Sequence, residues 1–62
     1  MGWKNTKQAA AEGAQAGASF VKKHPTEITA ANIRAVQRDA VRSRTPEGRA
    51  YWQAFADAMK RK

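Results

Sequence analysis

Three arginines in the middle of the chain, Arg34, Arg38 and Arg42, recur at four-residue steps. On a helix this spacing places them along one face, with no acidic residue on the same line. Guanidinium groups bind phosphate oxygens through paired hydrogen bonds and stack on bases. We call these three residues the arginine stripe and expect it to contact the backbone of a nucleic acid.

The chain carries twelve Lys and Arg against five Asp and Glu, a formal charge of +7 on 62 residues. A small domain with clustered cations is typical of nucleic-acid-binding proteins. The predicted nucleic-acid-binding residues are Arg34, Arg38, Arg42, Arg44, Arg49, Lys22 and Lys23.

The side chains that usually carry catalysis or bind metals are few. There is no cysteine, and the five carboxylates are scattered along the chain. The single histidine, His24, precedes Pro25, and we interpret it as the residue that caps the first helix, with no serine or carboxylate beside it. General acid–base chemistry and zinc binding both need several such groups close together. We therefore expect no enzymatic activity, no catalytic residue, no metal and no cofactor.

The apolar residues predict a thin core. Of the 26 hydrophobic residues 14 are alanine, and there is no leucine. Because few large side chains are available, we expect Trp52 and Phe55 to be core aromatics, and Tyr51 to be the most exposed of this group and able to stack on a base. Trp3 precedes the first helix and is either a lid on the fold or an anchor for a partner.

Capping signals predict an all-α fold, a small three-helix bundle forming one basic domain over residues 1–62. The first helix should span about Thr6 to Lys23, with Asn5 as N-cap and Gln8 completing a capping box. The second should begin at Thr26 or Thr29 and end near Ser43. The third should follow Thr45 as N-cap, with Pro46 at its first position.

Apolar residues at helical spacing indicate which faces of these helices pack inward. In the second helix they are Ile33, Val36 and Ala40, with Val41 at the margin. The third helix has the strongest pattern. Its apolar residues are Trp52, Phe55, Ala56 and Met59.

Small residues recur every four positions in the first helix, at Ala9, Gly13 and Gly17. Each glycine costs about 1 kcal/mol of helix stability relative to alanine, which indicates that something approaches this backbone closely. It is either another helix of the same fold or a partner, such as a second copy in a homodimer or a nucleic-acid backbone.

No stretch approaches the roughly 20 apolar residues that span a bilayer, and the start of the chain lacks the pattern of a signal peptide. We therefore expect a cytoplasmic protein with no membrane partner.

Two stretches resemble the bacterial ribosome modulation factor family. The first runs from Ala9 to Gly17 and contains Gly13-x-Gln15-Ala16-Gly17. The second is Tyr51-Trp52-x-Ala54-Phe55-x-Asp57-Ala58-Met59. The resemblance implies binding to the small ribosomal subunit, contact with ribosomal RNA and regulation of translation or ribosome dimerisation. The arginine-bearing middle helix has no counterpart in the family, so its role is inferred from charge alone.

The leading hypothesis is therefore a small non-enzymatic protein that binds structured RNA on the ribosome through its cations. A second hypothesis is a small inhibitor or adaptor, of the kind encoded by phages and mobile elements, that binds an acidic protein surface. A third is non-specific DNA binding.

Overall fold

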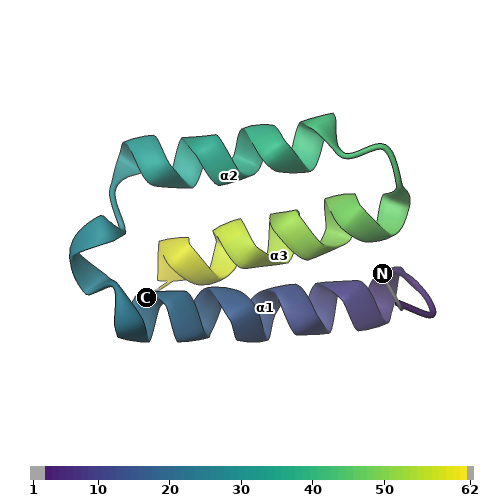
Figure 1. The fold of residues 1–62 in the computed structure, drawn as a ribbon, viewed down its shortest axis with the longest axis horizontal. Helices are drawn as coiled ribbons and strands as arrows, with labels where there is room; N and C mark the ends of the chain where they lie inside the picture. Colours follow the sequence, from purple (N-terminus) through teal and green to yellow (C-terminus); the bar gives the residue numbers. More distant parts are fainter. Residues whose placement is uncertain (1–2, 62) are drawn as a thin grey trace.

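The structure is a computed structural model that describes residues 3–61. Within them lie α1 (Thr6–Lys23), the single 3-10 turn η1 (Pro25–Glu27), α2 (Ala30–Arg42) and α3 (Pro46–Arg61). Figure 1 shows the three α-helices side by side, with α3 between α1 and α2. α1 and α3 run in the same direction and α2 runs in the opposite one. The predicted all-α three-helix bundle is confirmed for these residues, and none of its helices is both long and apolar enough to cross a membrane.

The ends of α1 follow the capping signals with one difference. The Asn5 side chain accepts a hydrogen bond from the Gln8 backbone N–H at 2.8 Å. The Gln8 side chain accepts from the backbone N–H of Lys4 at 2.7 Å, whereas a capping box would join it to the N–H of Asn5 itself. At the other end His24 is the C-cap, as predicted, and its N–H donates to the Phe20 carbonyl at 2.7 Å.

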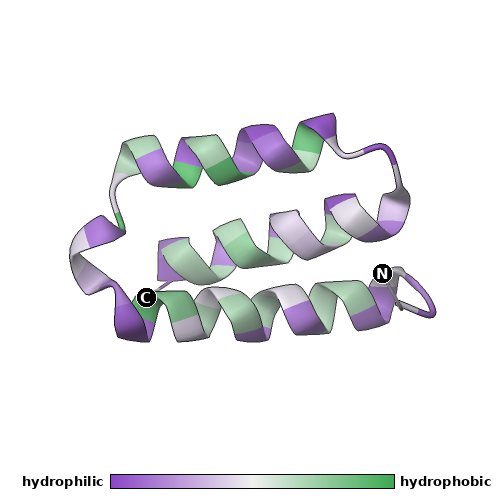
Figure 2. Cartoon of the chain, viewed as in Figure 1, coloured by the Kyte–Doolittle hydropathy of each residue, from purple (hydrophilic) through white to green (hydrophobic). Residues whose placement is uncertain are grey.

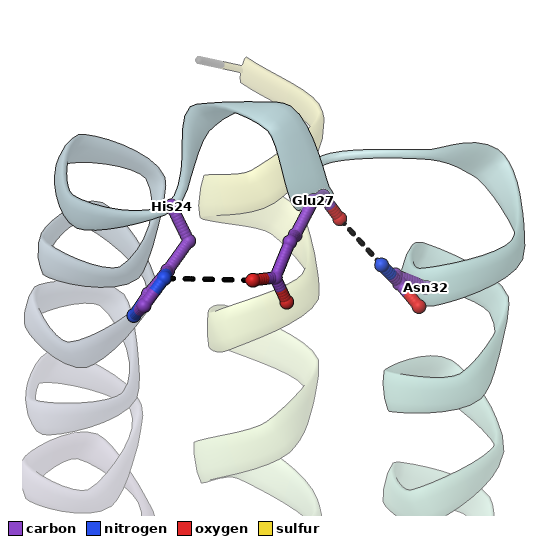
Figure 3. Close-up of polar contacts among 3 residues, drawn as sticks. All are labelled: His24, Glu27 and Asn32. Atoms are coloured by element: carbon purple, nitrogen blue, oxygen red, sulfur yellow. Dashed lines mark hydrogen bonds and ion pairs between the residues drawn. The ribbon is translucent and has the colours of Figure 1, made fainter.

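The start of α2 resolves the choice between two threonines in favour of Thr29. Its hydroxyl oxygen accepts from the Asn32 backbone N–H at 3.2 Å, while Thr26 belongs to the preceding turn η1. Figure 3 shows how the Asn32 side chain reaches back, and its Nδ2 donates to the Glu27 carbonyl at 2.6 Å. This bond fixes η1 against the first turn of α2.

α3 begins with the cap that the sequence predicts. The Thr45 hydroxyl accepts from the Gly48 backbone N–H at 3.0 Å, and Pro46 occupies the first helical position, where its missing N–H leaves no bond unmade. Only residues 43–45 separate α2 from α3, so the two helices pack as antiparallel neighbours.

α1 and α3 pack closely because Gly13 and Gly17 face α3. A Cβ added at Gly13 would overlap the Tyr51 carbonyl oxygen, and one added at Gly17 would lie 2.7 Å from the Phe55 carbonyl oxygen. Together with Ala9, which is fully buried, these residues form the surface of α1 that packs against α3.

The fully buried side chains are small, apart from Met59. Figure 2 shows the consequence in colour, since α1 and α3 have mostly pale, weakly hydrophobic positions and few deep green ones. The larger rings form an aromatic row in which adjacent ring centroids lie 5.1–6.4 Å apart. The aromatic row consists of Trp3, Tyr51, Trp52, Phe55 and Phe20.

Every member of the aromatic row is half-buried. Trp52 and Phe55 therefore pack against other rings, but they are not the fully buried core aromatics that the sequence predicted. The physical reason is that α1 and α2 pack on different sides of α3, which leaves the surface over the rings without a covering helix.

Candidate nucleic-acid interface

The arginine stripe lies on the outer side of α2. The inner side of this helix buries Ala40 and half-buries Ile33, Val36 and Gln37. Arg34, Arg38 and Arg42 are all exposed. Each four-residue step moves about 6 Å along the helix axis and about 40° around it, so the stripe extends over about 12 Å and follows a shallow spiral.

The arginines of the stripe have no carboxylate partners among residues 3–61. The single contact there between a basic side chain and a carboxylate joins His24 Nδ1 to Glu27 Oε2 at 3.5 Å (Figure 3). No Lys or Arg side chain of these residues lies within 4.0 Å of one of their carboxylates. Because nothing in this part of the chain neutralises the guanidinium groups, they are free to bind an external anion.

The contact between His24 and Glu27 corrects one expectation. The sequence predicts that His24, just before Pro25, stands away from any serine or carboxylate at helical spacing. The turn η1 folds the chain back so that Glu27 comes within reach. Both side chains are about half exposed, at 50% and 56%, which identifies a surface pair next to the C-cap of α1.

Arg44 and Arg49 extend the cationic surface at one end of the molecule. Arg44 lies in the connection between α2 and α3, and the Arg49 backbone N–H donates to the Thr45 carbonyl in the first turn of α3. Both residues are exposed. Since α2 ends at Arg42, these three arginines gather around one connection.

Lys22 and Lys23 lie elsewhere. They occupy the last turn of α1, which Figure 1 places at the opposite end of the bundle from the α2–α3 connection. The predicted cations therefore form one continuous group of five arginines and a separate lysine pair.

The face formed by Ala9, Gly13 and Gly17 is occupied by α3 of the same chain. The alternative that a partner or a nucleic-acid backbone uses this face is therefore excluded for the folded chain, because contact would require α1 to leave α3.

Trp3 folds back over the bundle. Its indole Nε1 donates to Glu12 Oε1 at 3.0 Å, and its ring lies 5.2 Å from that of Tyr51. Between a lid and a partner anchor, the structure shows a lid. It also half-buries Tyr51, the aromatic residue that the sequence predicted to be most exposed.

Two surface features were not predicted. Val41 is 76% exposed, although the sequence places it at the margin of the apolar pattern of the second helix. The inward face of α2 is formed around Val36 and Ala40, and Val41 lies outside it. A shallow groove of about 290 Å³ lies between α1 and α3, lined by Ala14, Ala18, Val21, Ala58 and Arg61. The helical spacing of Ala14, Ala18 and Val21 could have predicted this groove. Because alanine occurs throughout the first helix, this spacing did not stand out.

The side chains that could ligate a metal are scattered in the described part of the chain. No group of three or more His, Asp or Glu side chains within residues 3–61 is close enough to hold a metal ion.

Comparisons with protein-family models, with curated proteins and with solved structures found no match to this chain.

Proposed function

We propose that this protein is a small RNA-binding protein that associates with the ribosome and regulates translation. The observation that carries the proposal is the exposed arginine stripe, together with Arg44 and Arg49, none of which has a carboxylate partner within residues 3–61. Arginine suits this role because its planar fork matches phosphate oxygens and its guanidinium is weakly hydrated.

The net charge supports an anionic partner of large size. A formal charge of +7 on 62 residues raises the local concentration of polyanions and speeds their association. Each phosphate that a cation neutralises releases condensed counterions, so binding should weaken steeply as salt increases.

The ribosome enters the proposal through the resemblance to the ribosome modulation factor family. In the fold, the two stretches that carry it face each other, since Gly13 packs on the backbone of Tyr51 and Gly17 packs on Phe55 and Ala58. Both stretches thus support the α1–α3 packing, which leaves RNA contact to the cations of α2 and its neighbours.

Charge reversal of the stripe tests RNA binding. We expect Arg38→Glu with Arg42→Glu to weaken binding to ribosomal RNA fragments by at least about tenfold and to reduce the salt dependence by about two phosphate contacts. The control is Lys4→Glu with Lys7→Glu, which removes the same charge from the α1 side. Filter binding at several salt concentrations measures both quantities, and an unchanged affinity and salt slope in the stripe variant would refute the proposal.

Sedimentation of a tagged copy through a sucrose gradient, with and without ribonuclease, tests the ribosome. Migration with small subunits or whole ribosomes is the expected result. A partner that survives nuclease would instead favour binding to an acidic protein, and equal affinity for unrelated DNA duplexes would favour non-specific DNA binding.

A further inference from the structure

α3 contacts its two neighbours on different sides, which determines what its remaining surface presents. The backbones of Tyr51 and Phe55 lie against the glycines of α1. Ala56, which is fully buried, lies about a third of a turn further round α3 and faces α2. The α2–α3 interface therefore has one edge that faces α1 and one edge that faces away from α1.

Two cations of α3 lie on the side that looks away from α1. Arg49 and Lys60 stand seven residues before and four residues after Ala56, so each lies within about 40° of it around the helix. Both are exposed. Because α2 runs antiparallel to α3 (Figure 1), its half-buried Gln37 and the neighbouring Arg34 are turned to this same side.

The result is two rows of cations along one surface. The α2 row contains Arg34 and, about 6 Å further along the axis and about 40° further round towards the outer side of α2, Arg38. The α3 row contains Arg49 and Lys60, about 16 Å apart. Packed helix axes are separated by about 8–10 Å, and the short connection brings Arg38 and Arg49 to about the same height. We call these four residues the two-row basic face.

The two-row basic face has no acid within it. Two carboxylates neighbour it in the sequence, Asp39 beside Arg38 and Asp57 three residues before Lys60; each lies further round its helix, and neither is within 4.0 Å of a Lys or Arg side chain of the described residues. The uncharged side chains between and beside the rows are Gln37, Gln53 and the exposed Val41.

We propose that the two-row basic face binds duplex RNA, with each row contacting the phosphates of one strand. This inference rests on the proposed RNA-binding function and names its substrate class. A duplex presents two lines of phosphates on either side of a groove, which two rows of cations match. A single strand presents one line, for which the arginine stripe alone would suffice.

The position of the aromatic residues also favours a duplex. Proteins that bind single strands stack bases on aromatic side chains within the basic groove. In the described residues Phe20 of α1 packs on Phe55, on the side of α3 that faces α1. Trp52 lies between that side and Ala56, and its ring packs on those of Tyr51 and Phe55. None of the four residues of the two-row basic face is aromatic. It can hold a backbone but has no platform for unstacked bases.

The glutamines favour RNA over DNA. A side-chain amide both donates and accepts hydrogen bonds, and the 2′-hydroxyl that distinguishes RNA from DNA does the same. Gln37 and Gln53 lie next to the cation rows, where a shallow groove edge would bring 2′-hydroxyls.

Fluorescence anisotropy with three probes tests the inference: a short RNA duplex, one of its strands alone, and a DNA duplex of the same sequence. We expect the unmodified protein to bind the RNA duplex tightest. Arg49→Gln with Lys60→Gln should weaken duplex RNA binding by about tenfold or more and reduce the salt slope by about 2. The matched control is Lys7→Gln with Arg61→Gln, which also removes one Lys and one Arg, from α1 and from the groove side of α3, and should have a much smaller effect.

Two results would overturn the duplex inference while leaving RNA binding intact. One is a single strand that binds as tightly as the duplex, and the other is an equal loss of duplex affinity in the two double variants. If the unmodified protein binds none of the RNA probes, both this inference and the proposed function fail. Circular dichroism of each variant establishes that the helices are retained.

Discussion

At Gly13 and Gly17 the absence of a side chain sets the distance between two helices. The α3 backbone occupies the space that a Cβ at either position would need. At Gly48 the situation is milder, because an added Cβ would meet side-chain hydroxyl oxygens and no backbone atom, that of Ser43 at 2.7 Å and that of the cap residue Thr45 at 3.0 Å. Substitution of glycine by alanine should therefore be tolerated less well in α1 than at Gly48 of α3.

We expect Gly13→Ala to destabilise the fold by about 1–3 kcal/mol, the usual range for overpacking, although alanine regains about 1 kcal/mol of helix propensity. Gly48→Ala should change stability by less than about 1 kcal/mol. Thermal unfolding followed by circular dichroism measures both. An equal or larger loss at Gly48 would show that α3 does not approach Gly13 as closely as described.

At the scale of the helices, stability depends on a few caps as well as on burial. Thr45 is the best defined, since its hydroxyl accepts the Gly48 N–H at 3.0 Å and Pro46 follows it. Because the core is small, each such hydrogen bond contributes a large share of the net free energy of unfolding.

Thr45→Ala should cost about 1 kcal/mol because the first turn of α3 loses its cap, which corresponds to a fall in Tm of about 4–8 °C for a domain of this size. Thr45→Ser keeps the hydroxyl and should stay within a few tenths of the parent. Equal Tm values for the alanine and serine variants would contradict the role of this cap.

The helices themselves could be predicted because their signals are local. Asn5, Thr45 and Pro46 mark two of the starts without reference to the rest of the fold. The start of α2 could not be decided, because Thr26 and Thr29 are equally good caps and the choice depends on the Asn32 side chain bonding to the Glu27 carbonyl. Such a bond exists only after η1 has formed.

The candidate site could be predicted only in part. Four-residue spacing placed Arg34, Arg38 and Arg42 on one exposed face, which the structure shows. Spacing within α2 could not reveal that Arg49 and Lys60 share a surface with it, because that depends on how α3 is rotated against α2. Nor could it separate Lys22 from the arginines, since this separation follows from the opposite directions of α1 and α2.

For the whole molecule, the unbalanced charge acts over the full length of the fold. The longest dimension is 32 Å, and at an ionic strength of about 0.01 M the Debye length is about 30 Å. Under these conditions each cation is repelled by nearly all the others, and self-repulsion of this kind destabilises the compact state.

We therefore expect Tm to rise by several degrees when sodium chloride increases from about 0.01 M to about 0.15 M, where the Debye length falls to about 8 Å. Lys7→Gln with Arg61→Gln, which has two fewer positive charges, should gain less. Differential scanning fluorimetry across a salt series measures this. A Tm that is constant or falls with salt would mean that favourable charge contacts outweigh the repulsion.

The parallel arrangement of α1 and α3 has a consequence for how the chain folds. α2 and α3 meet across a three-residue connection, so their contacts can form early from neighbouring segments. Gly13 and Tyr51 are about forty residues apart in the sequence, and joining them requires closure of a long loop, whose entropy opposes the step until the contacts are made. The α1–α3 interface should therefore form more slowly than the α2–α3 interface. We expect α1 to dock last, onto an α2–α3 hairpin that already displays both rows of cations.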